Sequence, residues 1–125
     1  MDTAKLLERI RKHPDSHRIG MIASHLGIVR GSSRDGRKVK EIEVAYDIDV
    51  LNDIVQHTKA LPGIVEVSVD IREGLLKVGD ELLFVAVGGD IRENVFPALI
   101  ETVDRIKQKA SRKKEIYEKE DKKWE

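Results

Sequence analysis

Residues 64–87 read IVEVSVDIREGLLKVGDELLFVAV, and the predicted fold is built around this stretch. Val65, Val67, Val69 and Ile71 alternate with polar residues, which is the period-two pattern of a half-buried β-strand. Residues 73–80 contain two glycines and predict a turn. Residues 82–87 form a continuous apolar run, which is typical of a central strand buried on both faces. The stretch therefore predicts two strands joined by a turn.

Three helices are predicted around these strands. The first begins at a cap provided by Asp2 or Thr3 and ends before Pro14. The second covers residues 48–61, where apolar residues recur at helical spacing. The last opens at Asp90, which forms with Glu93 the pattern of a capping box.

Two further strands precede the second helix. Residues 18–30 form one apolar strand, and residues 42–46 alternate as a second. A polar Gly-Ser loop over residues 31–37 separates them. The order α-β-β-α-β-β-α predicts an α+β fold in one domain over residues 1–125, whose residues 108–125 are a charged tail or helix extension.

Composition excludes several classes of protein. The chain has 125 residues with 23 Lys+Arg and 23 Asp+Glu, so a generic nucleic-acid coat or polybasic membrane binder is not expected. It has no cysteine, which excludes disulfides and thiolate sites and suits a reducing compartment. No apolar run is long enough to span a membrane, and we expect a cytoplasmic protein.

The zero net charge hides a strong segregation along the chain. Residues 1–40 hold ten basic and four acidic residues, residues 41–104 four and fourteen, and residues 105–125 nine and five. If the fold joins the two basic ends, the result is a basic pocket on a neutral protein.

The chemistry-bearing residues that remain are basic. The four histidines are scattered, and Pro14 interrupts the one pair at i,i+4 spacing, His13 and His17, so a metal site is not expected. No P-loop or nucleophile motif is present. Arg30 ends a strand before a flexible loop, where an arginine either binds a phosphate or carboxylate or is simply solvated. Lys107 begins a cluster of cations that either lowers a lysine pKa for catalysis or forms a charged surface.

Several motifs together resemble the large, catalytic subunit of molybdopterin synthase. They follow the family's order and spacing over about residues 18–116. The motifs are Gly27-Ile28-Val29-Arg30, residues 35–39, the strand ending at Tyr46, Arg72-x-Gly74-x-Leu76-x-x-Gly79-Asp80, Arg92 with Phe96, Asp104-x-x-Lys107, and Lys114 seven residues after Lys107.

The resemblance implies an α/β hammerhead-type fold and a sulfurtransferase of molybdenum cofactor biosynthesis. Such an enzyme inserts two sulfurs into cyclic pyranopterin monophosphate as the dithiolene of molybdopterin, without a metal or redox cofactor. The implied sulfur donor is the thiocarboxylated Gly-Gly C-terminus of a small ubiquitin-like subunit. The implied assembly is a homodimer of large subunits within a heterotetramer.

Position for position, the resemblance implies that Lys107 and Lys114 are catalytic. They orient the tail, stabilise the developing oxyanion and supply protons. Arg30 is implied to contact the pterin or the tail, and Arg92 to hold the cyclic phosphate in its own pocket or in that of a neighbouring protomer.

The sequence also departs from the family pattern. Ile71 and Ile91 stand where the family has histidines, and Ser111 and Lys113 stand where it has a proline and an aromatic residue. Lys113 is therefore an alternative to Lys114. The departures also leave open a non-catalytic relative that binds a pterin, a nucleotide or a sulfur-carrier tail. An RNA-binding α+β domain is disfavoured, because only Phe84 and Tyr46 place aromatic rings in strands.

Overall fold

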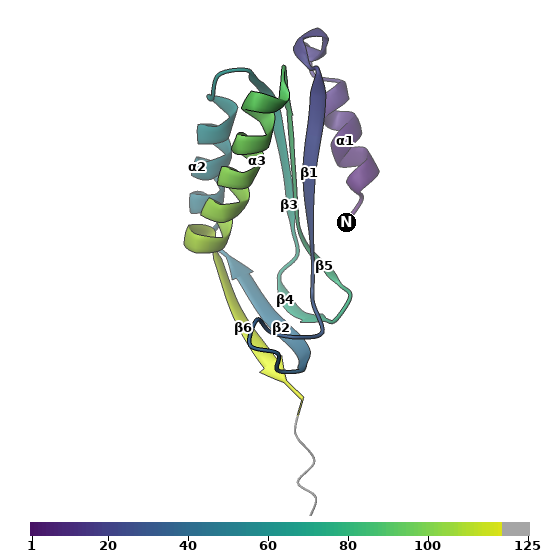
Figure 1. Cartoon of the computed structure of the whole chain (residues 1–125), viewed down its shortest axis with the longest axis vertical. Helices are drawn as coiled ribbons and strands as arrows, with labels where there is room; N and C mark the ends of the chain where they lie inside the picture. The colour runs from purple at the N-terminus through teal and green to yellow at the C-terminus, as the bar shows by residue number, and fades with distance from the viewer. Residues whose placement is uncertain (119–125) are drawn as a thin grey trace, which may run out of the picture.

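Two antiparallel three-stranded sheets form the framework of the chain, whose computed structural model describes residues 1–118. The first sheet has the order β1-β5-β3, with β1 (Met21–Ile28), β5 (Glu81–Gly89) and β3 (Ile64–Ile71). The second has the order β4-β2-β6, with β4 (Gly74–Lys77), β2 (Val39–Tyr46) and β6 (Ser111–Tyr117). Figure 1 shows the second sheet below α2 and α3, at one end of the elongated molecule.

Helices cover both faces of the first sheet. Helix α1 (Thr3–Arg11) lies on one face, and α2 (Ile48–Lys59) and α3 (Arg92–Arg105) lie on the other (Figure 1). Within β5, Phe84 and Ala86 pack against α1, whereas the alternate residues point into the main core. The unbroken apolar run at 82–87 is thus explained by a strand with a covered surface on each side, as predicted.

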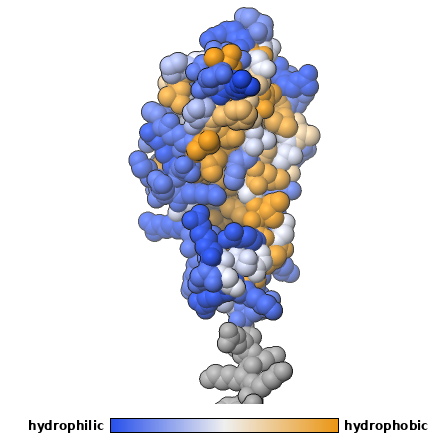
Figure 2. All heavy atoms as spheres, viewed as in Figure 1, coloured by the Kyte–Doolittle hydropathy of each residue, from blue (hydrophilic) through white to orange (hydrophobic). Residues whose placement is uncertain are grey.

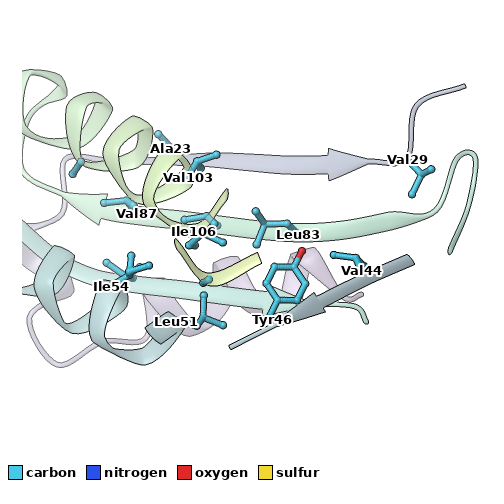
Figure 3. Packing of buried hydrophobic residues seen from close by; sticks show 14 of the residues in the cluster. Ala23, Val29, Val44, Tyr46, Leu51, Ile54, Leu83, Val87, Val103 and Ile106 are labelled. Atoms are coloured by element: carbon cyan, nitrogen blue, oxygen red, sulfur yellow. The ribbon is translucent and has the colours of Figure 1, made fainter. Parts of the chain in front are cut away.

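The main core continues from the first sheet into the second. Here Val44 and Tyr46 of β2 belong to the same buried cluster as three residues from other elements: Leu83 of β5, Leu51 of α2 and Ile106 at the end of α3 (Figure 3). The Tyr46 hydroxyl donates a hydrogen bond of 3.2 Å to the Leu82 carbonyl oxygen. This contact joins the two sheets at the corner where the candidate site lies.

The start of α3 differs from the predicted capping box. The helix begins at Arg92, and its N-cap residue Ile91 provides no side-chain cap. Asp90 instead accepts hydrogen bonds from the Ile91 amide at 2.7 Å and from the Asn94 side chain at 2.9 Å. The acidic residue therefore stabilises the turn that precedes the helix rather than its free amides.

The C-terminal region corrects the prediction of a tail or helix over residues 108–125. Helix α3 ends in a π-helical turn, η2 (Ile106–Ala110), and residues 111–117 pair with β2 as strand β6. A lysine-rich segment adopts this strand because the free edge of β2 satisfies its backbone groups. Residues 119–125 of the predicted tail lie outside the described residues.

The α+β class is confirmed, and its element order gains two strands. Strand β4 lies within the segment 73–80 that was expected to be a turn alone, and β6 follows the last helix. A 3-10 turn, η1 (Ser16–Arg18), leads into β1. Within residues 1–118, no helix is both long and apolar enough to cross a membrane.

Candidate functional site

A pocket of about 590 Å³ opens where the end of β1, the turn η2 and the second sheet meet. Helix α3 packs against the first half of β1, and the pocket begins where that helix ends. Its apolar floor includes Ile42, Val44 and Leu83. Its charged lining consists of Arg30, Arg34, Lys107, Lys113 and Glu115.

The charge of this pocket is strongly positive. Four cations face one carboxylate, and the pocket is more enclosed than a surface groove because two sheets and a loop surround it. Arg30 and Arg34 come from the basic N-terminal part of the chain, and Lys107 and Lys113 come from the basic C-terminal part. The fold thus joins the two basic ends, which confirms the basic pocket expected from charge segregation and favours an anionic ligand.

The loop after β1 is held by side-chain contacts of its own. The Nε atom of Arg30 donates a hydrogen bond of 2.8 Å to the Ser32 carbonyl oxygen, which leaves the end of the guanidinium free for a ligand. The buried Ser33 hydroxyl bonds to the Asp35 carboxylate, and Gly36 turns the chain at a φ of +87°. The hydrogen bond from the Ser33 hydroxyl, and then the one from the Arg37 amide, lower the pKa of Asp35.

A stacking contact ties this loop to β6. The Arg37 guanidinium lies 3.6 Å from the centre of the Tyr117 ring. Cation–π contacts of this kind stabilise by about 0.5–1 kcal/mol at exposed sites. The contact joins the two segments that carry Arg34 and Lys113, so the cations on opposite sides of the pocket are held in one framework.

Lys107 is positioned by the π-helical turn. The wide turn η2 redirects the chain from α3 into β6, and such turns are often found at functional sites. The Ser111 hydroxyl donates to the Lys107 carbonyl oxygen at 3.1 Å, and the Asp47 amide donates to the Ala110 carbonyl oxygen at 2.8 Å. The backbone on both sides of Lys107 is therefore fixed while its side chain reaches the pocket.

The register of β6 separates the two candidate lysines that follow. Lys113 lies opposite Val44, which is buried and lines the pocket. Lys114 lies opposite Glu43, an exposed residue on the other face of the sheet. Because successive side chains of a strand point to opposite faces, the structure places Lys113 in the pocket and Lys114 outside it.

Arg92 also lies outside the pocket of its own chain. It is at the start of α3, just after the end of β5 that pairs with Met21. The pocket is at the opposite end of β1, about 20 Å away at roughly 3.3 Å per strand residue. The Arg92 side chain is 77% exposed, and its Nε atom lies 3.2 Å from Glu93.

The structure also brings in residues that the sequence did not single out. His25 lines the pocket from β1, and Arg34 and Glu115 line it from the loop and from β6. Burial, and then the nearby Lys107, lower the pKa of His25, whereas burial raises the pKa of Tyr46 to about 12. His25 is therefore neutral near pH 7, and Tyr46 acts as a hydrogen-bond donor rather than an acid.

The sequence of β1 contains no signal for His25, because apolar residues occur at both parities of this strand; that His25 shares a face with the buried Ala23 is seen only in the structure. Among residues 1–118, no three histidine, aspartate or glutamate side chains come together as a metal site.

Comparisons with known proteins give one consistent result. The profile of the MoaE protein family matches residues 1–109. A molybdopterin synthase structure from Staphylococcus aureus is 26% identical, with a TM-score of 0.73, and the match covers 89% of this chain and 84% of that one. The molybdopterin cofactor biosynthesis protein E from Burkholderia multivorans is 25% identical, with a TM-score of 0.75 and coverage of 94% and 82%.

A third match shows the fold alone. A Helicobacter pylori structure, described as the complex of subunits 1 and 2 of molybdopterin-converting factor, is 19% identical to this chain. Its TM-score is 0.69, and the match covers 97% of this chain and 86% of that one.

Proposed function

The chain belongs to the MoaE protein family, the large subunits of molybdopterin synthase in molybdenum cofactor biosynthesis, and on that premise we propose that it transfers sulfur to cyclic pyranopterin monophosphate. The pocket that joins Arg30, Lys107 and Lys113 is the observation that carries this proposal. Its excess of cations suits a cyclic phosphate and a thiocarboxylate, because both are anions.

The sulfur donor in this proposal is a small ubiquitin-like subunit with a thiocarboxylated Gly-Gly C-terminus. The Helicobacter pylori complex of two subunits is a precedent for such a partner. We place the two large subunits as a homodimer within a heterotetramer, with one tail in each pocket. The absence of cysteine from the chain supports a cytoplasmic, reducing setting.

The chemistry follows from the donor. When the thiocarboxylate sulfur attacks a pterin carbon, a carbon–sulfur bond forms while the carbon–oxygen bond at that carbon breaks. The oxygen leaves with its electron pair and takes a proton from a lysine, and a thioester then joins the tail to the substrate. Water must then cleave the acyl–sulfur bond, which releases the tail as a carboxylate and leaves the sulfur on the pterin. In this mechanism Lys107 and Lys113 stabilise the oxyanion of the attacked carbonyl and supply protons, and Arg30 holds the pterin or the tail.

Arg92 enters this proposal through a second copy of the chain. Arg92 lies far from the pocket of its own chain, so we place its side chain at the pocket of the neighbouring subunit. Ile91, Phe96 and Ile100 lie close to it in sequence and are 52%, 49% and 62% exposed. Figure 2 shows hydrophobic side chains gathered in a band beside α3, down the middle of the face seen in Figure 1. An exposed apolar surface of this kind supports a subunit interface.

A non-catalytic relative is the alternative. Two observations favour it: Lys114 lies on the outer face of β6, and isoleucines stand at positions 71 and 91. Such a protein would use the same cationic pocket to bind a pterin, a nucleotide or a carrier tail without transferring sulfur.

Reconstitution distinguishes the two functions. The chain is mixed with a thiocarboxylated carrier and cyclic pyranopterin monophosphate, and molybdopterin is measured. We expect product from the wild-type chain and a loss of about 10²-fold or more in Lys107→Ala. Lys109→Ala, which removes an exposed cation of the same turn, is the matched control and retains activity. Tight substrate binding without product from the wild-type chain would select the alternative.

A further inference from the structure

His25 brings to the pocket a ring nitrogen that no other described residue satisfies. It lies in β1 opposite Val85, on the face that is turned toward α3 and η2. Its Nε2 atom is buried and has no hydrogen-bond partner among residues 1–118. A buried polar atom without a partner destabilises a fold, and such atoms in native proteins often have a role in binding or catalysis.

Gly27 lies beside the imidazole of His25 and adds no side chain there. A Cβ atom at position 27 would lie 3.4 Å from His25 Nε2 and 3.6 Å from Leu82 Cγ, so the ring extends along the strand above the glycine. The χ2 torsion of histidine is broad, and rotation about it exchanges the two edges of the ring. Rotation about this torsion would bring a ring nitrogen to the open side of the pocket while the backbone stays in place.

The surroundings of His25 keep the imidazole uncharged in the free protein. Burial and the charge of Lys107 both lower its pKa, so at neutral pH one ring nitrogen carries a lone pair. The other titratable groups of the pocket are Arg30 and Arg34 of the loop, Lys113 and Glu115 of β6, and Tyr46 of β2. In this cationic pocket a neutral imidazole is the natural proton acceptor, whereas a lysine ammonium is a donor.

We propose that His25 is the general base for the water that cleaves the thioester, a role that rests on the sulfur transfer proposed above. His25 takes one proton from the water as the water oxygen bonds to the acyl carbon. The acyl–sulfur bond then breaks, and its electron pair stays on the sulfur. The products are the tail carboxylic acid, which ionises in solvent, and a pterin thiolate, and His25 returns its proton to solvent.

His25 and Lys107 divide the work of this step. Both line the pocket, and they are close enough for the charge of Lys107 to affect the titration of the imidazole. Lys107 stabilises the oxyanion that forms on the acyl carbon, while His25 activates the nucleophile. Hydrolysis of an acyl group is accelerated by a neutral base that activates the water and by a cation that stabilises the oxyanion, and this pocket holds one of each.

A single-turnover experiment tests this role. The wild-type chain and His25→Gln are mixed with thiocarboxylated carrier and cyclic pyranopterin monophosphate, and intact mass is followed with time. Glutamine keeps hydrogen-bonding groups but cannot accept a proton near pH 7. We expect the carrier–substrate thioester to accumulate in His25→Gln, because its hydrolysis slows by about 10²-fold, while its formation remains near the wild-type rate.

Two further readouts separate catalysis from packing. His25→Phe fills the ring volume without a base, so we expect the same accumulation of thioester. The hydrolysis rate of the wild-type chain should fall as the pH is lowered and His25 becomes protonated, and this acidic limb should be missing in His25→Phe. In His25→Ala, added imidazole should restore part of the hydrolysis rate, which a purely structural role would not allow.

The outcomes also separate this inference from the proposed function. Wild-type product together with normal hydrolysis in His25→Gln and His25→Phe would overturn the role of His25 alone. No product from the wild-type chain would overturn both proposals. The carrier affinity and the melting temperature of each variant show whether a slower rate comes from the chemical step. If weaker carrier binding or a less stable fold explains the slower hydrolysis, the assignment of His25 as the base is overturned.

Discussion

Lys113 lies directly opposite Val44 in the β2–β6 ladder, on the face of that sheet that lines the pocket. Its neighbour Lys114 lies opposite Glu43 on the exposed face. We therefore expect Lys113→Ala to lower kcat/KM for sulfur transfer by about 10²-fold, because a cation is lost from the site. Lys114→Ala should stay within about twofold of wild type, as for other exposed substitutions. Steady-state kinetics of both variants with one carrier preparation decide the point, and the reverse ranking would contradict the register assignment.

A buried hydroxyl pair joins α2 and α3, which cover the same face of the first sheet. Thr58 Oγ1 of α2 and Thr102 Oγ1 of α3 lie 2.6 Å apart, and their residues are 2% and 0% exposed. We expect Thr58→Val and Thr102→Val each to lower the free energy of unfolding by about 1 kcal/mol. The bond between the two hydroxyls is lost, while the remaining hydroxyl keeps its contact with the carbonyl oxygen four residues earlier in its own helix. In urea unfolding, the double variant should lose less free energy of unfolding than the sum of the losses in the two single variants. If the losses simply add, the two hydroxyls make no direct contact.

Gly89 marks a close approach between β5, β3 and α3. A Cβ atom there would lie 2.6 Å from the Gly63 carbonyl oxygen and 2.7 Å from Val95 Cγ2. We expect Gly89→Ala to lower the free energy of unfolding by about 2 kcal/mol through overpacking. Gly31→Ala is the control, because its Cβ would meet only Val78 Cγ1 at 3.6 Å and should change stability by less than about 1 kcal/mol. Equal urea midpoints for the two variants would contradict this packing.

The lowered pKa of His25 makes the fold sensitive to acid. The ordinary pKa of a histidine is 6.5, so in the unfolded chain the His25 imidazole binds a proton below that pH. In the folded chain the same imidazole binds its proton only at a lower pH. The unfolded state then binds more protons, so the free energy of unfolding should decrease as the pH falls from 7 toward 5. His25→Phe has no such group and should lose less stability over this range.

Urea midpoints at pH 8 and pH 5 for the wild-type chain and His25→Phe measure this difference. The other three histidines are present in both proteins, so their contributions cancel in the comparison. An equal loss of stability in both would show that His25 titrates alike in the folded and unfolded states.

The features that depend on local sequence were predictable. The strand β3, the unbroken apolar run in β5 and the Asp2 cap of α1 all appear as expected, because each depends on residues of one segment. The half-buried alternation expected along β3 does not appear, because α1 covers its other face and Ser68 is buried. Strand β6 was not predictable in this way. Its lysine-rich sequence has no clear strand pattern, and only the open edge of β2 makes it a strand.

The same division applies to the site. The sequence by itself determined that basic residues are segregated to the two ends of the chain and that Arg30 and Lys107 adjoin apolar elements. Only the tertiary structure decided that Lys113 faces the pocket, that Arg92 lies about 20 Å away along β1, and that His25 belongs to the site. The reason is physical: local periodicity records which face of an element is buried, whereas a pocket depends on how separate elements pair and pack across the fold.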